Sequence, residues 1–205
     1  MTVTAAWASS DSSVGSITAA PTSPAGRLSG RVHGTVLLSV SHEGRTGSKS
    51  VNVVNSYGGN WSGSYTLTAC DASGSFVQWG WCRGKVGATV SMGLELVQSG
   101  SDSSQIKGTL SNGIIRFAPV TGSVTPDGRL VLTTDMQWPG RDGLAYRYQL
   151  GGWETQPISP PPSGAPQMSG RTAATLSGFG RSGNAYEEHR ITSLVNTAAQ
   201  TAQSE

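Results

Sequence analysis

The sequence has few charged side chains. Asp, Glu, Lys and Arg supply 13% of its 205 residues, against about 25% in an average globular protein. They leave a formal net charge of only +2. A protein that binds nucleic acid through phosphate contacts needs a broad basic face. The composition therefore argues against nucleic acid as a partner.

Strong helix formers and long apolar segments are also scarce. Three Lys and six Glu in the whole chain disfavour a helical bundle, because such residues fill many exposed helix positions. Without a run of about 18 apolar residues, no membrane-spanning helix is expected. The chain is rich instead in Gly (28), Ser (30) and Thr (20). This composition favours a turn-rich, secreted all-β protein.

Cysteine occurs only at Cys70 and Cys82. The turn signal Asp71-Ala72-Ser73-Gly74 follows Cys70, so a hairpin or short loop would bring the two sulfurs together. A disulfide is expected, and it would require an oxidising compartment; the alternative is two reduced, buried thiols. CxxC and Cys/His zinc spacing are both absent, so neither a metal nor a cofactor is expected.

Short strand patterns separated by turns fill residues 1–54, with strands expected over 2–7, 34–40 and 49–54. The order and spacing of several segments resemble the bacterial immunoglobulin-like group 2 (BIG2) domain of surface proteins and adhesins. The segments that carry this resemblance are Trp7-Ala8-Ser9-Ser10-Asp11, Ser13-Val14, Ile17, Gly26-Arg27-Leu28, Gly34-Thr35-Val36, Leu38, Val40, Gly44, Gly47 and the ending Val51/Val53.

The BIG2 resemblance implies a partial β-sandwich with an adhesive role outside the cell. The first strands of that family would precede Trp7. Residues 1–54 are therefore expected to be the C-terminal part of such a domain, in a chain that is a fragment and carries no signal peptide of its own. Alternatively, the partial sandwich pairs with a partner or with the second domain.

A linker is expected over 55–60, a β-barrel over 61–195 and a flexible tail over 196–205. Apolar and small residues alternate with Ser and Thr from Trp61 to Ala69, and the cleanest period-2 run extends from Val86 to Leu96. Asn-Gly and Asp-Gly turns divide the rest. Further strands are expected over 105–110, 114–124, 129–138, 144–152 and 167–176.

The segment 186–195 fits either a strand or a helix, and a strand that closes the sheet is favoured. About eight antiparallel strands in sequence order predict an up-and-down barrel, with a sandwich as the second choice. Residues 60–195 are similar at the level of fold to the lipocalin and avidin-like calycin class. Lipocalins have a Gly two positions before a Trp, as Gly59 stands before Trp61 here. This resemblance implies a small apolar ligand inside the barrel; the alternative is an interior filled by side chains.

Aromatic residues are the candidates for contact with a ligand or partner. In an extended chain, Trp79 and Trp81 would point the same way, and if exposed they would stack on sugars or grip a partner. The alternative is packing over a barrel mouth or against the disulfide. The complete set of candidates is Trp61, Tyr65, Trp79, Trp81 and Trp138.

No catalytic residue is predicted. His33, His42 and His189 are far apart in the sequence, form no recognisable triad and are expected on the surface. Glu187 and Glu188 are adjacent and would point to opposite sides of a strand, which argues against a paired acid and base. We therefore expect a non-enzymatic extracellular module with a structural or adhesive role, binding protein or carbohydrate at a cell surface. The alternative is a small-ligand-binding barrel of the lipocalin kind.

Overall fold

The computed structural model describes residues 5–19, 25–30, 33–99, 104–139, 144–158, 165–178 and 182–197. Within these ranges strands dominate and the one helix is four residues long, so the expected all-β class is confirmed. No helix in this described part is long and apolar enough to cross a membrane. The chain divides into two compact units, residues 1–56 with 126–128 and residues 57–125 with 129–205.

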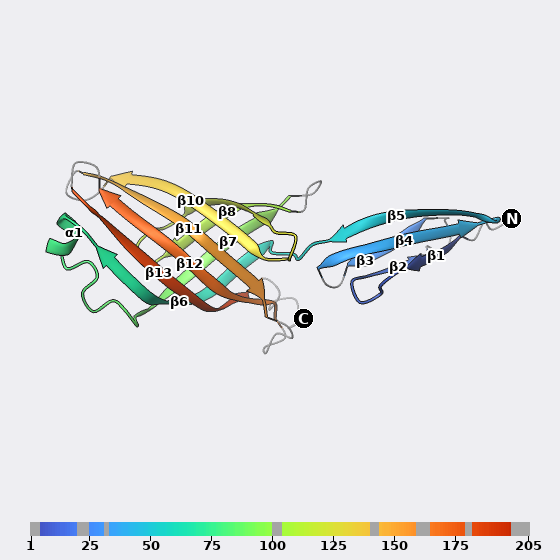
Figure 1. Ribbon diagram of the computed structural model, residues 1–205, viewed down its shortest axis with the longest axis horizontal. Coiled ribbons are helices and arrows are strands. Elements are labelled where there is room, and N and C mark those ends of the chain that lie inside the picture. The colour runs from blue at the N-terminus through green and yellow to red at the C-terminus, as the bar shows by residue number, and fades with distance from the viewer. Residues whose placement is uncertain are drawn as a thin grey trace. The chain divides into compact units, whose positions relative to one another are not determined.

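The first unit contains two small antiparallel sheets (Figure 1). Its strands β1, β4 and β5 form one sheet, and β2 pairs with β3 in the other. Glu43 and Gly44 join β4 to β5 with positive φ at both positions, as a tight hairpin turn requires. The strand bounds are Ala6–Ser9 (β1), Gly15–Ala19 (β2), Gly26–Gly30 (β3), Gly34–His42 (β4) and Arg45–Val53 (β5).

Few side chains of the first unit are fully buried. Among its described residues, Val36 and Leu38 are the buried hydrophobic side chains. Trp7 packs on Gly26, where an added Cβ would lie 2.9 Å from the indole ring. A unit with so little buried apolar area gains little stability from its own core.

The second unit is a closed antiparallel barrel of eight strands, as expected (Figure 1). Each strand pairs with its neighbour in sequence, and β13 pairs with β6 to close the sheet, which leaves no open edge. The strand bounds are Gly59–Ala72 (β6), Thr89–Gln98 (β7), Gln105–Asn112 (β8), Ala118–Val124 (β9), Leu130–Pro139 (β10), Ala145–Pro157 (β11), Gln167–Gly178 (β12) and Asn184–Asn196 (β13).

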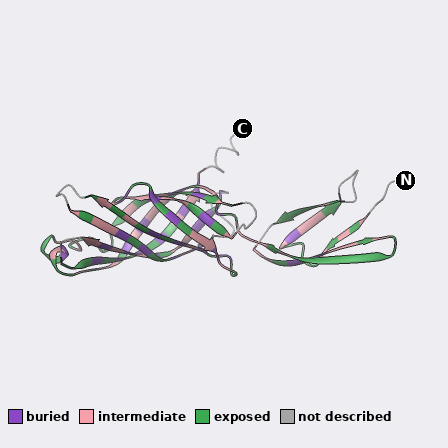
Figure 2. Ribbon diagram, turned by 90° about the horizontal axis from the view of Figure 1, so that it is seen from above, coloured by how far each residue is buried: buried purple, intermediate pink, exposed green. Residues whose placement is uncertain are grey.

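Buried and exposed residues alternate along the barrel strands, as Figure 2 shows. The inward side chains include several of the largest in the chain, and they form one continuous core that fills much of the interior. This packing stabilises the barrel because large buried side chains contribute most to hydrophobic stabilisation. The fully buried members with the greatest volume include Trp153, Tyr57, Tyr148, Phe76 and Leu94.

Some strand limits differ from the sequence-based expectation. The segment 186–195 lies within strand β13, which confirms the choice of a strand over a helix. The strand expected from Val86 begins only at Thr89, because residues 79–87 form turns in which Gly84 and Gly87 have positive φ. Beyond Thr197, the expected tail 196–205 lies outside the described residues.

Candidate functional site

The segment of residues 73–88, which we name the cap segment, joins β6 to β7, and Figure 1 shows its short helix at one end of the barrel. It contains the helix α1 (Ser75–Gln78), and Phe76 of this helix is fully buried in the barrel core. The backbone amides of Ser73 and Ser75 donate hydrogen bonds of 2.8 and 2.9 Å to the carbonyl oxygens of Asn184 and Ser182. The cap segment is therefore fixed to the start of β13.

The expected disulfide between Cys70 and Cys82 is present, with the two Cα atoms 5.5 Å apart. Cys70 lies on β6 directly opposite Glu187 of β13, and Cys82 follows Trp81 in the cap segment. Because the bond joins the cap segment to the barrel wall, it limits the positions that Trp81 can adopt above the barrel mouth.

Trp81 turns inward and meets Glu187. Its indole Nε1 donates a hydrogen bond of 2.9 Å to Oε1 of Glu187. Nζ of Lys85 lies 3.4 Å from the same oxygen and 3.5 Å from the centre of the Trp81 ring. A buried carboxylate needs such partners, because removing a charge from water is costly.

The second oxygen of Glu187 faces His189, two residues further along β13. Nε2 of His189 lies 3.1 Å from Oε2 of Glu187, and the imidazole packs on the ring of Tyr65 with centroids 4.3 Å apart. The His189 side chain is only 2% exposed. The expectation that His189 is a surface residue is therefore wrong, because its strand position points into the barrel.

The charge on Glu187 also affects its neighbours. Burial raises the pKa of Glu187, but the hydrogen bond with His189, the charge of Lys85 and the hydrogen bond from Trp81 outweigh it, so the net pKa lies below the ordinary value. Burial, with a contribution from the Glu187 charge, raises the pKa of Tyr65 to about 12. The carboxylate is thus held ionised and Tyr65 protonated at neutral pH.

Trp79 points differently from Trp81. Trp79 is the C-cap residue of α1, and Gly80, at φ 64°, separates it from Trp81, so the same-side orientation expected for an extended chain is not found. Trp79 is 41% exposed. Its ring lies 5.2 Å from Phe76 and 6.4 Å from Tyr146, measured between centroids. Tyr146 in turn stacks on Trp138 at 5.9 Å, so aromatic rings continue from the cap segment onto β10 and β11.

An open groove with a volume of about 700 Å³ lies beside the disulfide. We name it the disulfide groove. Its surface combines the two indole rings with side chains that donate or accept hydrogen bonds, namely Asp71, Gln78 and Arg83. The remaining lining residues are Cys70, Ala72, Val77, Gly80 and Cys82.

The five aromatic candidates from the sequence fall into two groups. Trp79, Trp81 and Trp138 gather at the capped mouth through Phe76 and Tyr146. Trp61 and Tyr65 are instead 4% and 3% exposed and belong to the core. Nε1 of Trp61 donates to the carbonyl oxygen of Tyr57 at 2.8 Å, which satisfies the polar atom of the buried indole.

Sequence reasoning missed the inward pair Glu187 and His189 and the rings of Phe76 and Tyr146. The pair carries a readable signal, since residues two apart on a strand share a face. The sequence contains no such signal for the rings of Phe76 and Tyr146, because their position beside the other aromatic residues depends on the path of the cap segment and on the pairing of β10 with β11.

Metal ligands do not gather anywhere in the described ranges: no group of three or more His, Cys, Asp or Glu side chains is placed to hold an ion. The chemistry of the capped mouth is thus that of aromatic stacking, hydrogen bonding and one buried ionic cluster. Comparison with protein-family models, with curated proteins and with solved structures found no match to this chain.

Proposed function

We propose that this chain is a non-enzymatic extracellular binding module, and that its disulfide groove holds a carbohydrate. The observation that carries the proposal is the pairing of an exposed indole, Trp79, with hydrogen-bonding side chains in one groove beside Cys70–Cys82. A protein ligand is the other partner that we expected from the sequence, and the experiment below separates the two.

A sugar ring offers an apolar C–H face and a rim of hydroxyl groups. An indole packs well on such a face, because it is large, flat and apolar. Asp71, Gln78 and Arg83 supply acceptors and donors for the hydroxyls. A groove with aromatic surface and a few directed polar groups is the usual composition of a small-ligand site.

The groove is also held in place before any ligand arrives. The disulfide joins it to β6, Phe76 anchors α1 in the core, and Trp81 is fixed by Glu187. A site ordered in advance pays less conformational entropy on binding. The rigidity of the cap segment therefore supports a binding role.

The ionic cluster of Glu187, Lys85 and His189 fits a structural role better than a catalytic one. Both oxygens of Glu187 already have partners, in Trp81, Lys85 and His189. A general acid or base must reach a proton of the substrate, whereas this carboxylate is 6% exposed beneath the cap segment. We also favour the outer groove over an apolar ligand inside the barrel, because Trp61, Tyr65 and Trp153 already occupy interior positions.

The extracellular placement rests on two points. The disulfide needs an oxidising compartment to persist. The resemblance of residues 1–54 to the immunoglobulin-like modules of bacterial adhesins supports the same setting and a role in attachment at a surface.

The test is a glycan array probed with the whole purified chain, followed by titration calorimetry with the oligosaccharide that gives the strongest signal. Trp79→Ala should weaken binding about tenfold or more, because one stacking ring contributes on the order of 1–2 kcal/mol. The matched control is Phe117→Ala, which removes another exposed ring that does not line the groove.

Binding that Trp79→Ala abolishes and Phe117→Ala leaves intact would support the proposal. A chain that binds no glycan on the array, or a Trp79→Ala variant that binds as well as the parent, would overturn it. A captured protein ligand whose affinity depends on Trp79 would show that the groove binds a protein, which is the alternative to a carbohydrate.

A further inference from the structure

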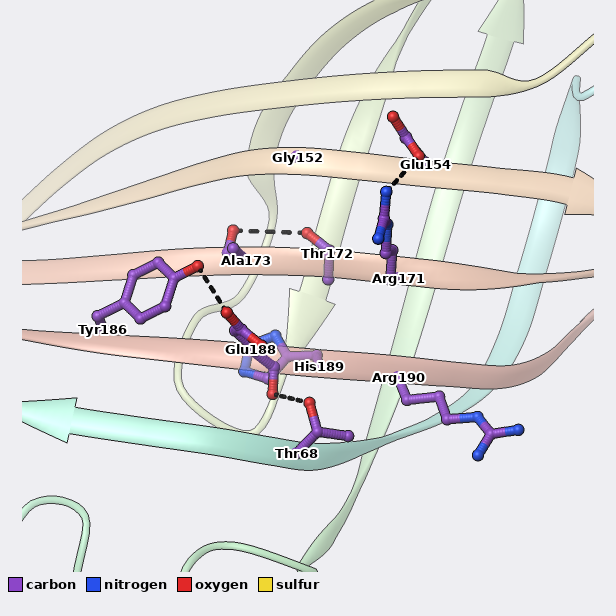
Figure 3. A pocket seen from close by; sticks show the side chains of 10 residues that line it. All are labelled: Thr68, Gly152, Glu154, Arg171, Thr172, Ala173, Tyr186, Glu188, His189 and Arg190. Carbon is purple, nitrogen blue, oxygen red and sulfur yellow. Dashed lines mark hydrogen bonds and ion pairs between the residues drawn. The ribbon is translucent and has the colours of Figure 1, made fainter. Parts of the chain in front are cut away.

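A second groove, independent of the disulfide groove, crosses the outer wall of the barrel over β11, β12 and β13. Thr68 of β6 and Arg129, which precedes β10, also line it. It consists of two adjoining pockets of about 330 and 500 Å³ that share Glu154, Arg171 and Arg190. We name it the wall groove. Figure 3 shows its first pocket, with Arg171 directed toward Glu154 and Arg190 directed away from it.

The wall groove is hollow because its floor has small residues and an irregular strand. The pairing of β11 with β12 shifts register between Gly151 and Glu154, and Gly152 in this bulge has φ 59°. Gly170 allows the two strands to approach so closely that an added Cβ would lie 1.9 Å from the carbonyl oxygen of Glu154. Gly152, Gly170 and Ala173 thus leave an open surface between larger side chains.

Positive charge is concentrated along this floor. Arg171 of β12 lies directly opposite Arg190 of β13, an arrangement that is unfavourable because like charges on paired strands repel. Arg129 is the third cation in the second pocket. A chain whose entire net charge is +2 therefore places three of its arginines at one site.

The carboxylate of Glu154 forms ion pairs with two of these arginines. Oε2 of Glu154 lies 3.3 Å from Nη2 of Arg171 and 3.7 Å from Nη1 of Arg129. For Arg190, no carboxylate within ion-pair distance is found in the described part of the chain. Glu188 is the other carboxylate that lines the groove, and it accepts a hydrogen bond from Tyr186. Three arginines thus face two carboxylates, and an anion bound between the arginines would balance the remaining positive charge.

We propose that the wall groove binds the anionic groups of a polysaccharide, either sulfate esters or carboxylates. A guanidinium offers a planar fork of donors that matches both groups. Gln156 and Ser169 line the same pocket and can bond to hydroxyls. The two adjoining pockets extend over three strands, which fits a chain better than a compact ion.

The other end of the groove supports this ligand class. Tyr186 lies there, 39% exposed, and its hydroxyl donates to Oε1 of Glu188 at 3.2 Å. An exposed ring beside fixed polar groups suits a sugar residue that carries no charge. Alternating charged and neutral residues of a polysaccharide would therefore meet the arginines and Tyr186 in turn.

The experiment measures binding of dextran sulfate, carboxymethyl dextran and uncharged dextran of equal length to the whole chain by surface plasmon resonance. Arg190→Gln should weaken binding of the charged polymers about five- to tenfold, because it removes one charge-assisted contact. Arg116→Gln is the matched control, an exposed arginine outside the groove. Trp79→Ala separates this site from the disulfide groove and should leave dextran sulfate binding unchanged.

The two charged polymers show which anionic group the arginines prefer. The proposal is overturned if uncharged dextran binds equally, if Arg116→Gln loses as much affinity as Arg190→Gln, or if Arg190→Gln binds as the parent does. Double-stranded DNA that binds as tightly as dextran sulfate, with the same dependence on Arg190, would also overturn it, because charge alone would then explain the contact. A failure of the carbohydrate array for the disulfide groove would not affect these outcomes.

Discussion

Nε1 of Trp81 donates a hydrogen bond of 2.9 Å to Oε1 of Glu187, which joins the cap segment to the last strand of the barrel across 106 positions of sequence. The bond is half-buried, and Lys85 and His189 complete the shell around the carboxylate. The order of the disulfide groove thus depends on a group inside the barrel.

Replacing Glu187 by Gln should destabilise the protein by about 1–3 kcal/mol at neutral pH, because charged hydrogen bonds to a buried carboxylate are lost. Urea unfolding of the purified variant measures the loss. Glu188→Gln is the control, since the neighbouring side chain points outward and is exposed. Equal stabilities of the two variants would contradict the structural role given to Glu187.

Glu187 should also make the stability of the protein depend on pH. The folded-state pKa of Glu187 lies below its ordinary value of 4.5, so its contribution is fully present above that value and is lost as the pH falls through the folded-state pKa. The difference in Tm between the parent and Glu187→Gln should therefore shrink on acidification from pH 7 to about pH 3. A Tm difference that grows on acidification would contradict the lowered folded-state pKa of Glu187.

Reduction of Cys70–Cys82 should lower the free energy of unfolding by about 2–4 kcal/mol, because the bond closes a loop and restricts the unfolded chain. The cysteines are 12 positions apart, so the loop is short and a value near the lower end is expected. Thermal unfolding with and without dithiothreitol measures the change. The Cys70→Ser/Cys82→Ser double variant, which cannot form the bond, should match the reduced parent.

Gly170 should tolerate no side chain. In Gly170→Ala the new Cβ would lie 1.9 Å from the carbonyl oxygen of Glu154, so β11 and β12 must move apart at a cost of roughly 1–3 kcal/mol. Gly151→Ala is a close control, since nothing lies within 4 Å of a Cβ at that position. Comparable losses in the two variants, measured by urea unfolding, would contradict the close approach of the strands.

Trp153 should be among the most costly core residues to truncate. Its side chain is fully buried and its Nε1 donates to Oγ1 of Thr155 at 3.1 Å. Trp153→Ala is expected to lose about 3–5 kcal/mol through the cavity it leaves. Phe117→Ala, which removes a ring that is 68% exposed, should change stability by less than about 0.5 kcal/mol.

Much of the barrel was predictable because period-2 alternation is a local property of the chain. Tyr65 and Leu67 on β6, and Met92, Leu94 and Leu96 on β7, all point inward as their spacing predicts. The prediction was wrong where the backbone leaves strand geometry. Val86 continues the alternation by sequence, yet it is 57% exposed in a turn, because glycines on either side take positive φ.

The candidate sites were less predictable, since they depend on pairing between distant strands. The sequence alone predicted the all-β class and favoured the barrel and a disulfide between Cys70 and Cys82, because alternation, turn residues and a short loop are local features of the chain. Only the tertiary structure decided that Trp81 would meet Glu187 and that Arg171 would face Arg190. Strand register fixes those contacts, and register is set by the packing of the whole barrel and by its bulges.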